Sequence, residues 1–346
     1  MEEAWWLASR GWYSVTMPME GVDKASFVLT DEQGGNVYGA AVGGALMLDN
    51  RNAVVSVVGG EVHAASSGSP LLLVSDLDGT MVGDDEAGKE FAQLWQRRHA
   101  PAGGVLAYST GRSLAQYESL AEERGEALLR PDALITAVGT RVYAPDGFGG
   151  AFAEDEDWSQ QLRVSWYEKA AQEALEEVMA ARSEEEVRAL GEGDQSEFKR
   201  SLLARADVSQ AVADELVAAV KARGYKAKAV VSGDGDFVYV DLLPEGAGKA
   251  ASLEYVRDCF AIDPSRVVAC GDSGNDTEML AAAASAVAVG NSQPALMEWA
   301  AAAKAASDAL AGENAEDGES TQQRLIISDA HMAAGIIEAL GTLRLA

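Results

Sequence analysis

The chain has 346 residues, of which 48% are apolar, and its formal net charge at pH 7 is -28. This length allows two or three domains with a sizeable hydrophobic core. So large an excess of acidic groups argues against binding to nucleic acid, whose phosphates are held by lysine and arginine. The only cysteines, Cys259 and Cys270, stand in segments predicted to be buried, so no disulfide framework is expected.

We expect a soluble, cytoplasmic protein that does not enter a membrane. No apolar run approaches the roughly 20 residues that a bilayer span needs. The chain begins with Met1-Glu2-Glu3, which is acidic where a signal or transit peptide would be basic or poor in acids.

Residues 1–69 are predicted to form a small β-rich module followed by a linker. Apolar and polar residues alternate at 25–30 and 53–58 between glycine-rich breaks, a pattern typical of short strands. An aromatic cluster near the start gives the module a weak resemblance to starch-binding carbohydrate modules: Trp5, Trp6, Trp12 and Tyr13. Aromatic residues also build the core of small β domains, so glucan binding and a structural role both stay open.

Residues 70–157 and 246–346 are predicted to form one α/β core, a doubly wound parallel sheet of the Rossmann-like kind. In the first part, strands at 71–75, 105–109 and 133–138 alternate with helices at 88–98 and 113–124. In the second part, we expect helices at 249–259, 276–284 and 331–340, strands at 267–270 and 286–289, and a partly helical segment at 300–321.

Residues 158–245 interrupt this alternation and are predicted to form an inserted α+β cap domain. Acidic, alanine-rich sequence at 167–190 indicates a solvated helix. The cap is also expected to hold a strand pair, 201–204 with 229–232, and a further apolar run at 237–243.

Polar residues follow several of the predicted core strands. Asp76 and Asp78 come after the first strand, Thr110 after the second, and Asp272 after the strand at 267–270, while Lys249 begins a helix. Because ligands of such sheets gather at the carboxyl ends of the strands, we expect these groups to share one crevice. Each residue alone also suits a turn or a helix cap, but together they offer a nucleophile, acids, a hydroxyl and a cation for phosphoryl transfer.

These ordered motifs resemble those of haloacid dehalogenase superfamily phosphatases. The sequence is most similar to sucrose-6-phosphate phosphatases, through Ser109-Thr110-Gly111-Arg112-Ser113, Cys270-Gly271-Asp272-Ser273-Gly274-Asn275-Asp276 and Asp241-Leu242-Leu243-Pro244. The resemblance runs from about residue 70 to the C-terminus. It implies a hydrolase that passes through an aspartyl-phosphate intermediate.

The resemblance also assigns chemical roles. Asp76 is the nucleophile, Asp78 is the general acid and base, and Thr110 and Lys249 bind the transferring phosphoryl group. The implied metal ligands are Asp76, Asp272 and the backbone carbonyl of Asp78, and hard oxygen ligands beside phosphate favour Mg²⁺. Substrate binding further involves Gly111, Arg112, Asn275 and, in the cap, Lys199. In this assignment Asn275 orients Lys249 or the phosphate, and Asp276 supports its loop.

Four features depart from the pattern of the resembled family. Leu202 follows Ser201 where an aromatic residue is usual, and Arg141 replaces an expected acid. Gly79 stands where a polar residue is frequent, and residues 237–240 are additional. The catalytic motifs are intact, so these differences concern the substrate.

We therefore expect an enzyme that hydrolyses sucrose 6-phosphate with Mg²⁺, with sucrose-phosphate synthase as a candidate partner and a glucan as a candidate ligand of residues 1–69. A second hypothesis is the same chemistry on another glycosyl phosphate, such as glucosylglycerol phosphate or mannosyl phosphoglycerate. Transfer of phosphate to a sugar in place of water, and a non-catalytic carbohydrate-binding scaffold, are the remaining alternatives.

Overall fold

The computed structural model describes residues 70–145, 151–313 and 323–345, together with four short strands among the first 69 residues. These strands form two antiparallel pairs, β1 (Ala25–Phe27) with β2 (Leu46–Leu48) and β3 (Ala53–Val58) with β4 (Glu61–Ser66). The predicted aromatic cluster at 5–13 lies outside the described residues.

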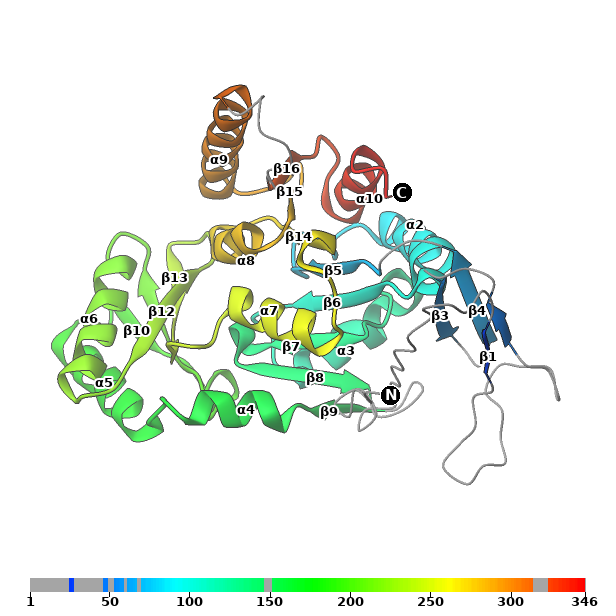
Figure 1. The fold of residues 1–346 in the computed structure, drawn as a ribbon. Coiled ribbons are helices and arrows are strands. Elements are labelled where there is room, and N and C mark those ends of the chain that lie inside the picture. Colours follow the sequence, from blue (N-terminus) through cyan, green and yellow to red (C-terminus); the bar gives the residue numbers. More distant parts are fainter. Residues whose placement is uncertain are drawn as a thin grey trace.

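The core is an eight-stranded sheet in the order β16-β15-β14-β5-β6-β7-β8-β9 (Figure 1). The first six of these strands are parallel, namely β16 (Arg324–Ile327), β15 (Ser285–Ala288), β14 (Val267–Gly271), β5 (Leu72–Ser75), β6 (Val105–Ser109) and β7 (Ala133–Thr136). An antiparallel hairpin, β8 (Arg141–Pro145) with β9 (Phe152–Glu154), closes one edge. The predicted α/β core is confirmed, with this added antiparallel edge.

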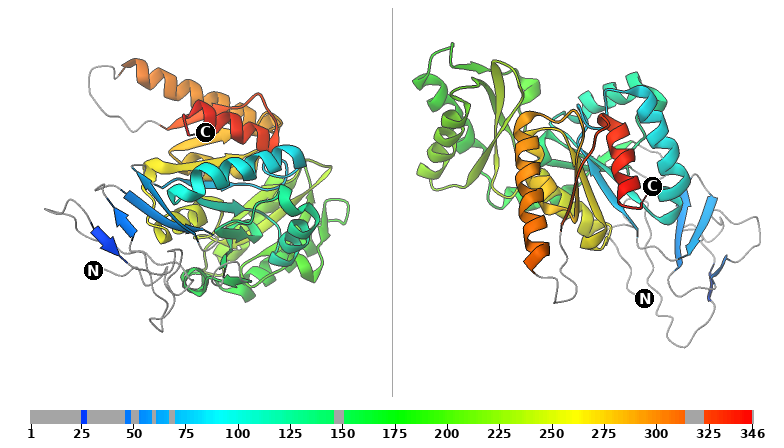
Figure 2. Two further views of the ribbon diagram at one scale, coloured as in Figure 1. Left: turned by 90° about the vertical axis from the view of Figure 1, so that its right-hand side faces the viewer. Right: turned by 90° about the horizontal axis from the view of Figure 1, so that it is seen from above.

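Helices cover both faces of the core sheet (Figure 2). One layer contains α2 (Asp85–Leu94), α3 (Leu114–Arg124) and α10 (Met332–Thr342), and the other α7 (Lys249–Cys259), α8 (Thr277–Ala282) and α9 (Pro294–Glu313). The side chains of β5 alternate between the two layers: Leu73 packs in the cluster with α2, whereas Leu72 and Val74 pack in the cluster with α7. Burial on both faces explains why this strand is a continuous apolar run.

Short helical turns make the connections. They are the π-helical turn η1 (Trp95–His99) and the 3-10 turns η2 (Ala100–Ala102), η3 (Gly125–Ala127), η4 (Ala137–Gly139), η5 (Glu192–Asp194), η6 (Pro264–Arg266) and η7 (Gly274–Asp276). The turns η4 and η7 lie at carboxyl ends of core strands and help to shape the site described below.

Residues beyond α4 (Glu156–Arg163) form a smaller α+β unit. Its antiparallel sheet has the order β10 (Val187–Ala189), β11 (Arg200–Arg205), β13 (Phe237–Pro244), β12 (Ala227–Ser232). Two helices, α5 (Glu168–Ala181) and α6 (Ser209–Ala222), pack with this sheet around a second hydrophobic core. Figure 1 shows this cap beside the core, with α5 and α6 on its outer side.

The predicted pairing of the strands at 201–204 and 229–232 is wrong, because β13 lies between them and pairs with both. The physical reason lies in β13 itself. Val240 and Leu242 face the cap helices, while Asp241 and Leu243 on the other face are also buried. A strand buried on both faces takes a central position, whereas β12 is only half-buried along its length and lies at the edge.

Among the described residues, no helix combines the length and the apolarity that crossing a membrane requires.

Candidate active site

The carboxyl ends of β5 and β14 bring two predicted aspartates together. The sheet ladder continues one residue past β5, where the Asp76 backbone N–H donates to the Cys270 carbonyl at 2.9 Å. Asp272 follows β14 two residues after Cys270, and only 8% of each aspartate is exposed. Neighbouring parallel strands therefore deliver both carboxylates to one buried position, as predicted.

Lys249 reaches this position from the first turn of α7. Its ammonium nitrogen lies 2.5 Å from Asp76 Oδ1 and 2.6 Å from Asp276 Oδ1, and the residue is buried. The other oxygen of Asp276 accepts hydrogen bonds from the backbone N–H groups of Asp272 at 3.1 Å and Ser273 at 3.0 Å. Asp276 therefore joins the η7 loop to the lysine.

Burial and crowding of like charges perturb these groups. Burial, reinforced by the neighbouring carboxylates, raises the pKa of Asp76 to about 8 although Lys249 opposes the shift. Burial likewise raises the pKa of Asp272 to about 6. Burial lowers the pKa of Lys249, but the carboxylates of Asp276 and Asp76 outweigh that effect and raise it overall. The lysine is therefore a permanent cation in the site.

The three aspartates form a cluster that can hold a metal ion. One oxygen each from Asp76, Asp272 and Asp276 lies within 4.8 Å of the others, and all three residues are buried. Carboxylate oxygens are the donors that hard divalent cations prefer. The side chain of Asp78 is not in this cluster, while Asp276, which sequence reasoning gave only a supporting role, supplies the third carboxylate.

Gly79 is required by the shape of this cluster. Its φ is +81°, and a Cβ atom there would lie 2.7 Å from Asp272 Oδ2. The next residue, Thr80, is fully buried and donates its hydroxyl to Asp272 Oδ1 at 2.8 Å. The departure at position 79 thus has a steric reason in this chain.

Asp78 and Arg112 bind each other through a two-pronged ion pair. Arg112 Nε donates to Asp78 Oδ2 at 2.8 Å and Nη2 to Oδ1 at 2.6 Å. About half of the Asp78 side chain is exposed, so the pair lies at the mouth of the site. In this conformation both oxygens of the predicted acid and base face Arg112.

Thr110 lies at the end of β6 with its hydroxyl buried. Its Oγ1 accepts from the Arg112 backbone N–H at 3.2 Å, and no described protein group receives its proton. That arrangement leaves the hydroxyl proton for an oxygen of a ligand. Gly111, the next residue, is exposed and leaves the approach open.

A strained turn beside Thr110 was missed by sequence reasoning. Val138, in η4, has a φ of +60°, a conformation that is rare for a β-branched residue, and its N–H donates to the Thr110 carbonyl at 3.1 Å. Gly139 follows with a φ of +80°, and a Cβ atom there would lie 2.3 Å from the backbone carbon of Gly248. The turn thus packs the Thr110 loop against the start of α7. The Gly139-Thr140 pair was the available signal.

Two predicted substrate residues have other partners in this structure. Asn275 accepts from the Ser273 hydroxyl at 2.7 Å, so Asp276 and not Asn275 orients Lys249. In the cap, Lys199 lies 3.4 Å from Asp241 Oδ1, and the Ser201 hydroxyl donates to the same oxygen. Lys199 is 8% exposed, which leaves a small part of its surface for contact with a ligand.

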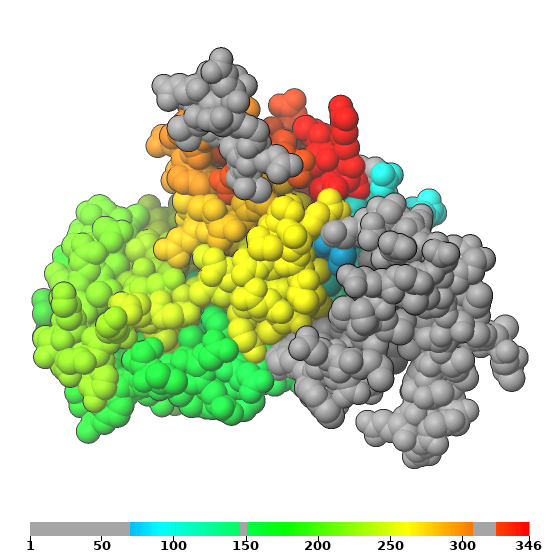
Figure 3. All heavy atoms as spheres, viewed as in Figure 1, coloured from blue at the N-terminus to red at the C-terminus, as the bar shows by residue number. Residues whose placement is uncertain are grey.

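The open face of the cap sheet is directed at the core. Lys228 on β12 reaches Glu278 in α8 at 3.3 Å, and Leu243 on β13 packs in a core cluster. Figure 3 shows the cap in contact with the yellow and orange segments that contain α7 and α8. Lys249 therefore lies on the side of the core that the cap covers.

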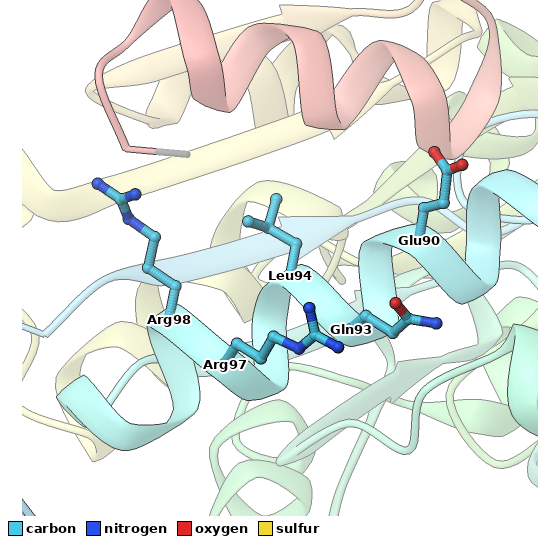
Figure 4. Close-up of a pocket in the computed structure, with 5 residues that line it drawn as sticks. All are labelled: Glu90, Gln93, Leu94, Arg97 and Arg98. Atoms are coloured by element: carbon cyan, nitrogen blue, oxygen red, sulfur yellow. The ribbon is translucent and has the colours of Figure 1, made fainter.

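A surface cavity of about 530 Å³ lies elsewhere, along α2 and η1 and beneath α10 (Figure 4). It is lined by Glu90, Gln93, Leu94, Arg97 and Arg98. None of the residues of the aspartate cluster lines it, so this cavity has no part in the chemistry described above.

A family model described as "Sucrose-6F-phosphate phosphohydrolase" matches residues 69–344 of this chain. "Sucrose-phosphatase 1" of Nicotiana tabacum is 31% identical over 80% of this chain, which spans 60% of that relative's length. "Mannosylfructose-phosphate phosphatase" of Agrobacterium fabrum is 30% identical over 66% of this chain and 86% of its own. The sucrose-phosphatase of Synechocystis sp. PCC6803, solved with sucrose and phosphate, shares the fold with a TM-score of 0.62 and 29% identity, over 80% of this chain and 99% of its own.

Proposed function

The chain belongs to the sucrose-6F-phosphate phosphohydrolase family, and on that premise we propose that it hydrolyses sucrose 6-phosphate to sucrose and orthophosphate. The observation that carries the proposal is the buried group formed by Asp76, Lys249 and the carboxylates of Asp272 and Asp276. These contacts support the proposal because they bring together a carboxylate that can act as a nucleophile, an ammonium group and further carboxylates that can bind a metal ion. The tobacco and Synechocystis relatives support the choice of sugar.

In the proposed reaction, Asp76 attacks phosphorus and the bond from phosphorus to the sugar oxygen breaks, which leaves an aspartyl-phosphate. Water then attacks this phosphorus, so phosphate is released and the Asp76 carboxylate is restored. Lys249 and the Thr110 hydroxyl hold the phosphoryl oxygens as their charge changes. Asp78 donates a proton to the leaving oxygen and later takes one from the water.

This role requires Asp78 to leave Arg112. Both oxygens of Asp78 receive hydrogen bonds from the guanidinium in the present conformation, so neither can exchange a proton with a sugar oxygen. A phosphate group is an equally good partner for an arginine fork. We therefore propose that the substrate phosphate takes Arg112 over and so frees Asp78.

We propose Mg²⁺ as the metal. The residues present fit it, since buried carboxylates at the ends of neighbouring strands are the donor set of a magnesium site next to phosphate. Asp76 and Asp272 would hold the ion, with the backbone carbonyl of Asp78 as the ligand implied by the family. When bound, the ion screens the negative charge of the phosphoryl group as the carboxylate approaches it.

A second candidate is the same hydrolysis on a different glycosyl phosphate. The Agrobacterium relative is named for a different disaccharide phosphate, mannosylfructose phosphate. The cap of this chain also departs from the family pattern at Leu202. Mannosylfructose phosphate, glucosylglycerol phosphate and mannosyl phosphoglycerate therefore belong in the test.

The test is phosphate release by the purified chain from sucrose 6-phosphate and from these three compounds, with Mg²⁺ or with a chelator. Asp76→Asn removes the nucleophile, and Asp214→Asn is its matched control because Asp214 is exposed on α6, outside the site. We expect Mg²⁺-dependent release that is highest on sucrose 6-phosphate and absent in Asp76→Asn alone. Highest activity on another compound would establish the second candidate, phosphate found on a sugar acceptor would indicate a transferase, and inactivity on every compound would contradict the proposal.

Three further predictions remain to be tested. A cytoplasmic location, association with a sucrose-phosphate synthase and glucan binding through residues 1–69 each follow from the sequence alone. Retention on starch, compared between the full chain and a chain that begins at residue 70, tests the last of these.

A further inference from the structure

Two arginines from the core side of the molecule hold one glutamate of the cap. Arg141 belongs to β8 at the edge of the core sheet, and Arg163 ends α4, whose Trp158 and Leu162 pack in a core cluster. Glu197 lies in the cap segment just before β11. The contact therefore crosses the boundary between the two units.

Both carboxylate oxygens of Glu197 are used. Arg163 Nε donates to Oε1 at 2.7 Å, and its Nη2 donates to Oε2 at 3.2 Å. Arg141 Nη2 donates to Oε2 at 3.1 Å. Arg141 is itself held on the core side by Glu154 and by the Ser159 hydroxyl at 3.2 Å. The glutamate is thus tied to two core elements at once.

The next residue reinforces the same contact. Phe198 is fully buried, and the guanidinium carbons of Arg141 and Arg163 lie 4.7 and 5.6 Å from its ring centroid. A cation over an aromatic face is attracted by the ring quadrupole. Trp166 Nε1 also donates to the Glu197 carbonyl at 2.6 Å. We call these five residues, Arg141, Arg163, Trp166, Glu197 and Phe198, the Glu197 clasp.

The clasp lies immediately before the cap residues that face the core. Lys199 follows Phe198, and Lys199 and Ser201 both contact Asp241 on the central strand of the cap sheet. Because the backbone at 197 and 198 is fixed to the core, the position of Lys199 relative to the aspartate cluster is fixed as well. A change at the clasp would therefore move Lys199, which the sequence predicts to contact the substrate, and leave Asp76 and Lys249 in place.

We infer that the Glu197 clasp positions the start of β11 over the active site, and that Arg141 and Arg163 are positioning residues for the sugar part of the substrate. This inference rests on the proposed function. It also gives a role to Arg141, which stands where the resembled family is expected to carry an acid. An acid at position 141 would repel Glu197, so this contact between the core and the cap requires the arginine.

The first test compares Arg141→Gln with Arg205→Gln. Arg205 is a half-buried arginine of β11 that pairs with Asp207, outside the clasp. The kinetics are measured with sucrose 6-phosphate and with p-nitrophenyl phosphate, which has no sugar. We expect Arg141→Gln to raise KM for the sugar phosphate about tenfold, as loss of a charge-assisted hydrogen bond predicts. The parameters for p-nitrophenyl phosphate, and both substrates with Arg205→Gln, should stay within about twofold of the unchanged protein.

Two further variants separate positioning from a general structural effect. Arg141→Lys keeps the charge without the fork and should recover part of the loss. The double variant Arg141→Gln/Glu197→Gln should lose little more activity than Glu197→Gln alone, because Glu197→Gln has already removed the carboxylate that Arg141 binds. Equal losses on both substrates, or fully additive effects of the two changes, would show that the clasp only stabilises the fold and would overturn the inference.

Hydrogen exchange gives a readout that does not depend on activity. Amides of residues 195–204 should exchange faster in Arg141→Gln than in the unchanged protein or in Arg205→Gln, while residues 71–76 of the core keep their protection. Unchanged exchange at 195–204 would contradict the inference even if the chain proved to act on another substrate. If the wild-type protein hydrolyses no sugar phosphate, the proposed function is contradicted. The hydrogen-exchange comparison would still show whether the Glu197 clasp fixes the start of β11.

Discussion

Asp276→Asn is the sharpest perturbation of the site, because it changes one charge and almost no volume. The carboxylate of Asp276 is fully buried and accepts hydrogen bonds from three nitrogen donors. Oδ1 receives the Lys249 ammonium at 2.6 Å. Oδ2 receives the N–H groups of Asp272 and Ser273 and lies 3.2 Å from the Ser273 hydroxyl, which donates its proton over the shorter distance to Asn275.

An asparagine cannot satisfy all of these donors. If its oxygen keeps the bonds of the η7 loop, its NH₂ group faces the Lys249 ammonium, and if the amide turns round, the NH₂ group faces two backbone N–H groups. Removing one partner of a buried ion pair costs about 3–5 kcal/mol. Lys249 keeps its contact with Asp76, so we expect the lower end of that range, about 3 kcal/mol of unfolding free energy.

The same change should reduce kcat. Of the two carboxylates that orient Lys249, only that of Asp76 then remains. The ammonium group is therefore less well placed to bind a phosphoryl oxygen. Loss of one well-placed stabilising group typically costs about 10²–10³ in kcat. Asn275→Ala provides the contrast, because Asn275 contacts Ser273 and should leave the orientation of Lys249 intact.

The free energy of unfolding is measured with denaturant and linear extrapolation, and kcat with the substrate identified above. Asp214→Asn is the control and should lie within about 0.5 kcal/mol of the unchanged protein, as surface changes do. A loss below about 1 kcal/mol together with a kcat within about threefold of normal would refute the reasoning. Lys249 would then be positioned by groups other than Asp276.

Three further predictions follow from particular residues. Gly79→Ala should abolish Mg²⁺-dependent stabilisation and activity. The Cβ of the introduced alanine would lie 2.7 Å from Asp272 Oδ2, and the backbone there has a left-handed conformation. Thermal unfolding with and without Mg²⁺ checks this. Burial, with Arg98 and Arg266 nearby, lowers the pKa of His99 to about 4, so folding loses stability as the pH falls from about 6.5 to about 4. His99→Gln should remove about 3 kcal/mol of that loss, seen as a flatter curve of unfolding free energy against pH. Burial raises the pKa of Asp272 to about 6, so its ionisation destabilises the metal-free fold as the pH rises through that value. In a chelator at pH 8, the free energy of unfolding of Asp272→Asn should therefore be about 1–3 kcal/mol higher than that of the wild-type protein.

The meeting of Asp76, Lys249 and Asp272 could be predicted from the sequence because the information is local. Each residue directly follows a buried strand or begins a helix, and parallel strands end at the same edge. Nothing beyond the apolar runs and their flanking residues is needed to expect these three groups in one crevice. The same reasoning placed α7 at its observed bounds, 249–259.

The partners of these groups could not be predicted, because the contacts join distant positions or choose between adjacent polar residues. Asn275 and Asp276 stand in the same turn, and only the path of η7 decides which one faces Lys249. The pairing of Asp78 with Arg112 spans 34 positions and depends on how the two strand-end loops lean. In the cap, the position of β13 between β11 and β12 is likewise a matter of non-local packing.

The charge of the site links its structure to the proposed chemistry. Three buried carboxylates, Asp76, Asp272 and Asp276, face one ammonium, Lys249, which leaves two negative charges when all are ionised. Burial makes that state costly, and the pKa of Asp76 is accordingly raised, so the cluster without a cation favours a protonated nucleophile. A divalent cation would bring the total to zero and let Asp76 stay ionised. The excess of carboxylates therefore gives a physical reason for a metal requirement that is independent of the sugar the cap selects.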